Sequence, residues 1–383
     1  MHKFIVIPDS FKGTMSSAEI CAIMKGVILR HHPQAEVTCI PVADGGEGSV
    51  DAFLEAMGGE KIFVTVHGPY GAEDLVQGFY GLLPDGTAVV EMAAAAGLPL
   101  VGDNKHAELT TTYGAGQLMA AAAQAGCKKL IVGLGGSATN DGGCGAAAAA
   151  GVKFYDANGS SFVPVGATLQ NIARIDTSCL LPALRNIPII TMCDIDNPLC
   201  GQHGAAAVFG PQKGADAACV AMLDAGLAHL ANIVRRDIGA EIKDLPGAGA
   251  AGGMGGGMAA FFASSLQMGI ETVLDAVKFD ELIADADLVL SGEGKIDTQS
   301  LRGKVVIGVA RRTRRANVPL VAVVGDIGDD IEAAYAEGVC GIFSINRVAV
   351  PYTEARLRAK RDLELTVENM LRFMKTMQLH GRA

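Results

Sequence analysis

Residues 133–145 combine glycines, small hydroxyl side chains and one acid, directly after an apolar run at residues 129–132. Glycine lets backbone N–H groups converge on an anion without side chains in the way. Ser137 and Thr139 add hydroxyl donors. Asp141 would repel a phosphate unless a cation lay between them, so this loop indicates phosphate together with Mg²⁺. That combination predicts phosphoryl transfer.

Four other acidic or glycine-rich turns stand in similar places, after predicted strands or before predicted helices: residues 9–13, 44–48, 194–198 and 292–297. In parallel sheets, ligands bind beyond the carboxyl ends of the strands. A single turn of this kind is usually an ordinary turn or helix cap, because Gly and Asp are common there. Five turns of this kind in similar positions favour a shared binding site.

Known phosphate-binding motifs fit less well. The chain has no GxxxxGK[ST] sequence. Gly247, Gly249 and Gly252 match the dinucleotide fingerprint, but the residues before them predict no strand. Residues 133–138 are also similar to the phosphate loop of the galactokinase and homoserine kinase superfamily, although the order of elements around them differs. A nicotinamide-dependent oxidoreductase and a non-catalytic ligand sensor therefore stay as alternatives to a kinase.

Charged side chains near these turns could complete such a site. Asp194, Asp196 and Asn197 offer oxygen ligands that suit Mg²⁺, with a stack of Asx turns as the ordinary alternative. Each nearby cation alone would usually be a solvated surface residue. Together they could bind a carboxylate and a polyphosphate: Lys12, Lys213, Lys295, Arg302 and Lys304.

The predicted elements place these turns on an α/β fold. The first part of the chain alternates predicted strands and helices, which is typical of a parallel, doubly wound sheet. These elements are a strand at 4–8, a helix with a capping box from Ser16 to Glu19, a strand at 36–42 and a helix at 50–57. Three closely spaced strands follow and predict antiparallel pairing. The remaining predicted elements are strands at 129–132, 188–192, 286–290, 320–324 and 341–345, and helices at 116–125, 216–236, 305–315 and 352–377. We therefore expect a discontinuous domain, 1–60 plus 285–383, with a second α/β domain, 61–284, inserted in it.

The amino-acid composition limits the kinds of partner that we expect for this protein. The 383 residues carry a net charge of −10, which argues against nucleic acid because a phosphate backbone requires a basic face. No uninterrupted apolar run approaches the roughly 18 residues of a membrane span. Nine cysteines, an odd number without a CxxC pair, indicate free thiols in a reducing compartment, so we expect a cytoplasmic protein. No feature decides between a monomer and a homodimer.

Seven segments together resemble the bacterial glycerate kinase family: residues 8–12, 42–48, 135–143, 193–199, 209–214, 247–253 and 292–297. The resemblance implies a flavodoxin-like domain with a restriction-endonuclease-like insert. It also implies ATP-dependent phosphorylation of D-glycerate with Mg²⁺. The expected product is 2-phosphoglycerate, with 3-phosphoglycerate as the alternative. One departure is Lys295, where Arg is frequent in the family, and Lys cannot bind an anion in the bidentate way of Arg.

These observations give each candidate residue an expected role. Asp194, Asp297, Lys295 and Lys12 are predicted to be catalytic, and Ser10, Asp44 and Arg302 to contact the substrate. Which of Asp194, Asp196 and Asp297 binds metal and which accepts the hydroxyl proton stays open. The metal ligands are predicted to come from Asp194, Asp196 and Asp141. The predicted phosphate-binding residues are Gly135, Gly136, Ser137, Thr139, Gly249, Gly252 and Gly253.

Overall fold

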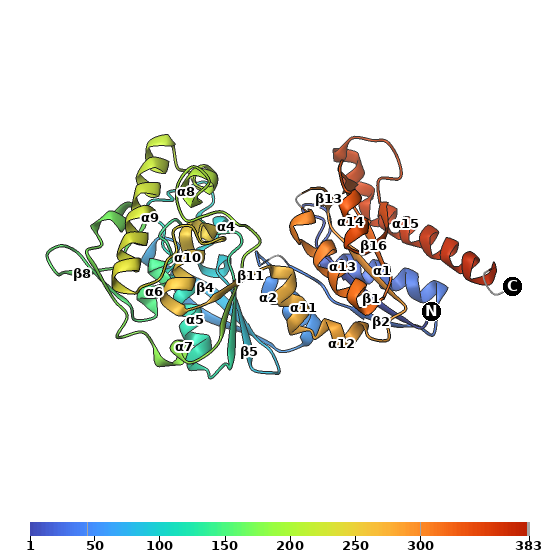
Figure 1. The fold of residues 1–383 in the computed structure, drawn as a ribbon, viewed down its shortest axis with the longest axis horizontal. Coiled ribbons are helices and arrows are strands. Elements are labelled where there is room, and N and C mark those ends of the chain that lie inside the picture. The colour runs from blue at the N-terminus through green and yellow to red at the C-terminus, as the bar shows by residue number, and fades with distance from the viewer. Residues whose placement is uncertain (44, 299, 381–383) are drawn as a thin grey trace. The chain divides into compact units, whose positions relative to one another are not determined.

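The computed structural model describes residues 1–43, 45–298 and 300–380. Its chain forms two compact units (Figure 1). Unit 1 comprises Met1–Ala43 and Ile270–Ala383, and unit 2 comprises Asp44–Gly269. A discontinuous α/β unit with a second α/β unit inserted in it is what the sequence predicts. The contact-based boundaries lie earlier in the chain than the predicted ones, because helix α2 (Ser49–Met57) contacts strands of unit 2 and helix α12 (Phe279–Ile283) packs on a helix of unit 1.

Unit 1 is built on a five-stranded sheet in the order β2-β1-β12-β14-β16. All four strand pairs are parallel. If the five strands of this sheet are numbered 1 to 5 in chain order, their order across the sheet is 2-1-3-4-5. This is the flavodoxin-like arrangement, so the predicted fold of this unit is confirmed. The strands are β1 (Lys3–Pro8), β2 (Glu36–Cys39), β12 (Leu288–Gly292), β14 (Leu320–Val324) and β16 (Val339–Ser344).

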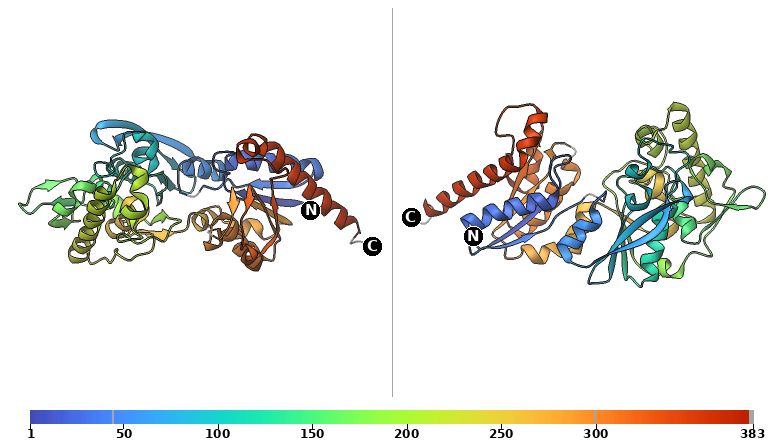
Figure 2. Two further views of the ribbon diagram at one scale, coloured as in Figure 1. Left: turned by 90° about the horizontal axis from the view of Figure 1, so that it is seen from above. Right: turned by 180° about the vertical axis from the view of Figure 1, so that it is seen from behind.

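Helices cover this sheet, and the smaller elements lie at its strand ends. Helices α1 and α15 lie side by side in Figure 2 and pack together on the sheet residues Phe4, Val6 and Leu288. Helix α13 contacts β12 and β14. The helices are α1 (Ser17–His31), α11 (Gly269–Ala276), α12, α13 (Val305–Ala316), α14 (Glu332–Glu337) and α15 (Tyr352–His380). The small elements are β13 (Lys295–Ile296), η3 (Ser300–Arg302) and β15 (Asp326–Ile327).

Local sequence explains where α1 begins. The Ser16 hydroxyl accepts a hydrogen bond from the Glu19 N–H at 3.2 Å, and the Glu19 carboxylate accepts one from the Ser16 N–H at 2.9 Å. This is the predicted capping box, and it satisfies two N–H groups that the first helical turn leaves without partners. Helix α1 therefore begins directly after β1 and its turn.

Unit 2 contains a six-stranded mixed sheet in the order β11-β10-β6-β5-β4-β3. The pairs β3–β4 and β4–β5 are antiparallel, as predicted from their close spacing, and the other pairs are parallel. A separate three-stranded sheet has the order β8-β7-β9. The strands are β3 (Glu60–Gly68), β4 (Gly71–Leu82), β5 (Thr87–Glu91), β6 (Lys129–Gly133), β7 (Lys153–Tyr155), β8 (Ser161–Phe162), β9 (Arg174–Asp176), β10 (Ile189–Met192) and β11 (Ser265–Gln267).

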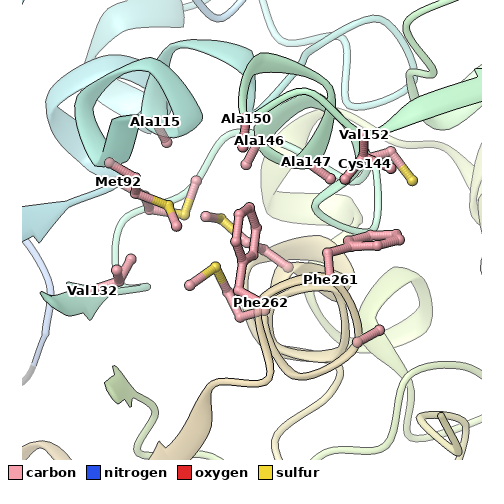
Figure 3. Packing of buried hydrophobic residues seen from close by; sticks show 14 of the residues in the cluster. Met92, Ala115, Val132, Cys144, Ala146, Ala147, Ala150, Val152, Phe261 and Phe262 are labelled. Atoms are coloured by element: carbon pink, nitrogen blue, oxygen red, sulfur yellow. The ribbon is translucent and has the colours of Figure 1, made fainter. Parts of the chain in front are cut away.

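The helices of unit 2 pack through small side chains. Figure 3 shows Phe261 and Phe262 of α10 facing the alanine-rich helix α6, and Phe261 stacks edge-on against Phe154 at 5.7 Å between ring centroids. The helices are α2, α3 (Ala93–Ala96), α4 (Leu98–Val101), α5 (Tyr113–Gln124), α6 (Cys144–Ala149), η1 (Gly166–Asn171), α7 (Pro182–Arg185), α8 (Ala205–Phe209), η2 (Pro211–Lys213), α9 (Ala217–Asp237) and α10 (Ala250–Phe262). Small side chains let these elements approach closely enough to hold the loops described below.

Helix α9 is long and apolar enough to cross a membrane by length and composition alone. It also packs on η1, α8 and β9 within unit 2, and it buries residues such as Leu223, Leu227 and Leu230 completely. A core helix passes the same length and composition test, so this one helix is weak support for a membrane span.

Candidate active site

In unit 1, the turns that follow three neighbouring strands meet at one edge of the sheet. The Asp9 N–H, just after β1, donates to the Gly292 carbonyl of β12 at 2.7 Å. The Gly325 N–H, just after β14, donates to the Glu293 carbonyl at 3.0 Å. Between β1 and β12 the order in which strands are added to the sheet reverses. This position is the topological switch point, where ligands bind in open parallel sheets. The predicted clustering of turns 9–13 and 292–297 is therefore present.

The predicted catalytic residues of unit 1 lie in these turns. A Cβ built on Gly294 would lie 3.5 Å from the Phe11 Cα and 3.7 Å from the Lys12 nitrogen, so the two turns are in contact. Lys12 and Lys295 are exposed, whereas Ser10 and Asp297 are half-buried. The Asp297 N–H donates to the Ser300 hydroxyl at 3.2 Å, which ties this turn to the start of η3. Cations and acids thus share a solvent-facing edge.

Helix α13 begins at the same edge. Its N-cap is Lys304, whose N–H donates to the Ser300 carbonyl at 3.2 Å. Helix N-termini favour anions because their N–H groups point outward and the helix dipole is positive there. The side chain of Arg302 lies outside the described residues, as does Asp44, so their predicted roles in substrate binding stay predictions.

Glu293 is a residue that the sequence analysis did not single out. Its side chain is 5% exposed, and among the described residues no hydrogen-bond partner reaches its Oε1. Burial raises the pKa of Glu293 to about 8, and the charges of Asp9 and Asp297 add to that rise. The Ser300 hydrogen bond and Lys304 oppose it. The sequence signal was its place between two glycines after a strand, but burial is not visible in a sequence.

Asp141 organises the glycine-rich loop of unit 2. It is fully buried, and its Oδ2 accepts hydrogen bonds from the Thr112 N–H at 2.8 Å and the Gly145 N–H at 3.1 Å. Its Oδ1 accepts from the Gly143 N–H at 3.0 Å. Burial raises the pKa of Asp141, and these hydrogen bonds oppose the rise. The prediction that Asp141 binds metal does not fit this geometry, because both oxygens are occupied and none reaches solvent.

Lys213 lies behind the same loop and is 2% exposed, so it is not the surface cation that its sequence context suggests. Its Nζ donates to the Ser137 hydroxyl and to the Thr139 carbonyl, both at 2.7 Å. Burial lowers the pKa of Lys213 to about 7, and the charge of Asp141 opposes that shift. Next to these groups, the Thr139 hydroxyl and both side-chain polar atoms of Asn140 are buried without hydrogen-bond partners among the described residues. Buried polar groups of this kind call for a ligand or water.

Several predicted phosphate-binding glycines instead serve backbone packing. A Cβ on Gly252 would lie 2.0 Å from the Thr139 carbonyl oxygen, and one on Gly249 would lie 2.3 Å from that of Pro198. A Cβ on Gly253 would lie 2.8 Å from Leu227. The Gly249 N–H donates to the Asn197 carbonyl and the Gly135 N–H to the Gly45 carbonyl. Gly135, Gly249, Gly252 and Gly253 therefore allow segments to approach each other. The N–H groups of Gly135 and Gly249 are already bonded, which corrects the predicted role of these two, and phosphate binding by Gly252 and Gly253 stays a prediction. Gly136, at positive φ and exposed, is open to a ligand.

Asp194 and Asp196 follow β10. Asp194 is half-buried and accepts a hydrogen bond from the Gly269 N–H at 2.6 Å, whereas Asp196 is exposed. Among the described residues, no group of three or more His, Cys, Asp or Glu side chains could hold a metal ion. Mg²⁺ commonly uses one or two protein carboxylates and completes its shell with phosphate oxygens and water. Asp194 and Asp196 offer donor oxygens of that chemistry for Mg²⁺ bound with a nucleotide.

The fold and the site define an α/β protein of two units, with acids and lysines at the switch point of a flavodoxin-like sheet, where such proteins bind ligands. Comparison with known proteins defines the family. The glycerate kinase family model matches residues 4–375, and this chain belongs to that family. The predicted family membership is confirmed.

Individual relatives agree over almost the whole chain. A glycerate kinase of Bacillus subtilis (strain 168) is 43% identical over 382 residues, which cover 98% of this chain and 100% of the relative. A glycerate 2-kinase of Escherichia coli (strain K12) is 42% identical over 345 residues, 90% of each chain. The crystal structure of a proposed glycerate kinase 2 from Salmonella typhimurium LT2 superposes with a TM-score of 0.88 at 39% identity, covering 99% of both chains.

Proposed function

We propose that this kinase transfers the γ-phosphoryl group of ATP to the 2-hydroxyl of D-glycerate and releases 2-phospho-D-glycerate and ADP. The similarity to a protein named glycerate 2-kinase, over 90% of both chains, supports the choice of hydroxyl. The observation that carries the reaction type is the presence of exposed lysines together with acids at the switch point of unit 1. Phosphoryl transfer requires mainly positioned charge of both signs.

Each predicted site residue has a proposed role in this reaction. Lys12 and Lys295 bind the glycerate carboxylate or the transferring phosphoryl group, and Ser10 contacts the substrate. Ser137, Thr139 and Gly136 bind nucleotide phosphates, with Asn140 as an additional donor and Lys213 holding the loop in place. Asp194 and Asp196 are the carboxylates for Mg²⁺, which neutralises phosphate charge when bound. The proposed location of the protein is the cytoplasm.

An assay of ADP release with ATP, Mg²⁺ and D-glycerate tests this proposal and separates it from the alternatives. The kinase account predicts ADP release that depends on both D-glycerate and Mg²⁺. A nicotinamide-dependent oxidoreductase would instead reduce NAD with a hydroxy acid and release no ADP. A non-catalytic sensor would bind glycerate or ATP, measurable by calorimetry, without turnover. Either of the last two outcomes would overturn the proposed function.

A further inference from the structure

The buried carboxylates of the chain provide a comparison that singles out one of them. Four acids are buried among the described residues: Glu91, Asp141, Glu293 and Asp362. An acid taken out of water is stable only where donors or cations replace the lost hydration.

Three of these acids have structural partners. Glu91 accepts a hydrogen bond from the Val50 N–H at 3.2 Å at the start of α2, where the chain offers no side-chain cap. Asp141 is bonded within its loop as described above. Asp362 accepts two hydrogen bonds from the guanidinium group of Arg358, at 2.9 and 3.2 Å. The fold therefore explains why each is buried.

Glu293 differs from these three acids. Within the described residues its Oε1 is buried without a partner, and its other neighbours include two further acids, Asp9 and Asp297. Burial and the charges of Asp9 and Asp297 disfavour its ionised form, and the hydrogen bond with Ser300 and the charge of Lys304 favour that form. The fold gains little from a carboxyl here, so the position requires an explanation in the chemistry of the site.

The position of Glu293 supplies that explanation. It directly follows β12, and its main chain is joined to the end of β14 through Gly325. It thus lies at the switch point, in the turn that carries Lys295, and the next residue, Gly294, contacts the turn that carries Lys12. Resting on the proposed function, we propose that Glu293 is the catalytic base that accepts the proton of the substrate hydroxyl during phosphoryl transfer.

The step balances without any further reactant. The hydroxyl oxygen forms a new bond to the γ-phosphorus while the bond from that phosphorus to the bridging oxygen of ADP breaks. The hydroxyl proton moves to the Glu293 carboxylate and leaves to solvent after product release. Only the ionised carboxylate accepts a proton, so the raised pKa of Glu293 makes the rate increase with pH up to about 8. Burial of the carboxyl group is the largest cause of the raised pKa, and Ser300, Asp9, Lys304 and Asp297 adjust its value.

The test compares E293Q, E293D and the wild type by kcat and KM between pH 5.5 and 9.5, with ATP, Mg²⁺ and D-glycerate. E293Q keeps the side-chain size but cannot accept the proton. It should lose at least about 100-fold in kcat and lose the rise of kcat with pH, with both KM values within about threefold. E293D keeps a carboxylate and should retain the rise with pH at reduced kcat. D362N, which alters a buried acid of the same unit, should keep the wild-type pH profile.

An E293Q enzyme with kcat within threefold of the wild type and an unchanged pH profile overturns the assignment of Glu293 and leaves the proposed reaction intact. If E293Q does not fold, an E293D enzyme whose kcat no longer rises with pH overturns the assignment as well. A wild type that releases no ADP with D-glycerate overturns both proposals.

Discussion

Lys213 shows how one buried cation can hold a glycine-rich loop in place. Its Nζ donates hydrogen bonds to the Ser137 hydroxyl and the Thr139 carbonyl, which fixes the shape of the loop proposed to bind phosphate. A charged amine without a carboxylate in contact is costly to bury, which is why its pKa falls to about 7. A bound phosphate would favour the charged form and would lower that cost.

The lowered pKa of Lys213 gives a prediction for stability against pH. The folded state gives up its proton near pH 7, whereas the unfolded lysine stays protonated up to about 10.5, so the unfolded state binds more protons between these values. The contribution of Lys213 to stability therefore rises with pH in this window. Between pH 7 and 9, the wild type should gain at least about 1 kcal/mol relative to Lys213→Met, measured by urea unfolding. An equal difference at both pH values would contradict this account.

At the scale of elements, the start of α10 illustrates a backbone turn that depends on glycine. Ala251, Gly252 and Gly253 all have positive φ, at 52°, 65° and 90°. This left-handed turn brings the Gly252 carbonyl to the Gly142 N–H at 3.0 Å and lays the turn against residues 139–143. The loop that carries Thr139 and Asn140 is therefore supported from behind by α10.

Two neighbouring substitutions test this support. Gly252→Ala places a Cβ 2.0 Å from the Thr139 carbonyl oxygen and should lower the free energy of unfolding by at least about 2 kcal/mol. Ala251→Gly is the matched control, because glycine relieves the left-handed strain at that residue, and it should stabilise the protein by about 0.5 kcal/mol. Urea unfolding measures both. A Gly252→Ala protein as stable as Ala251→Gly would show that the close approach does not matter.

Elements were largely predictable from the sequence, because periodicity and caps are local signals. The capping box at Ser16, the antiparallel run of β3, β4 and β5, and the final helix were all expected and are present. For the start of α10, the sequence instead predicts a phosphate-binding loop. A glycine that makes room for a phosphate and one that makes room for a neighbouring carbonyl look the same in a sequence, so only the contacts of Gly249 and Gly252 separate them.

The candidate site was predictable in outline and less so in its details. The turns at the ends of β1 and β12 were expected to meet because parallel strands share an edge, and they do. The roles of Asp141, Lys213 and Glu293 depend on burial and on hydrogen bonds between segments far apart in the chain. Sequence spacing carries no information on those contacts, so the sequence alone predicts Asp141 as a metal ligand and does not single out Glu293.

At the scale of the whole molecule, the acids with predicted catalytic roles are found in both units. Asp194 belongs to unit 2 and Asp297 to unit 1. Asp194→Asn and Asp297→Asn should each lower kcat by at least about 100-fold with little change in stability, because Asp194 is a proposed Mg²⁺ ligand and the charge of Asp297 acts on the proposed base, Glu293. Asp285→Asn, an exposed acid paired with Lys3 before β12, is the control and should keep the wild-type kcat. Near wild-type turnover in both Asp194→Asn and Asp297→Asn would remove these acids from the mechanism.

The central claim is that this chain phosphorylates D-glycerate at its 2-hydroxyl. Phosphorus and carbon NMR of a completed reaction with ATP, Mg²⁺ and ¹³C-labelled D-glycerate tests it most directly, since coupling between phosphorus and carbon identifies the phosphorylated position. We predict 2-phosphoglycerate and ADP in equal amounts. Accumulation of 3-phosphoglycerate as the initial product, or unchanged D-glycerate with intact ATP, would contradict the account.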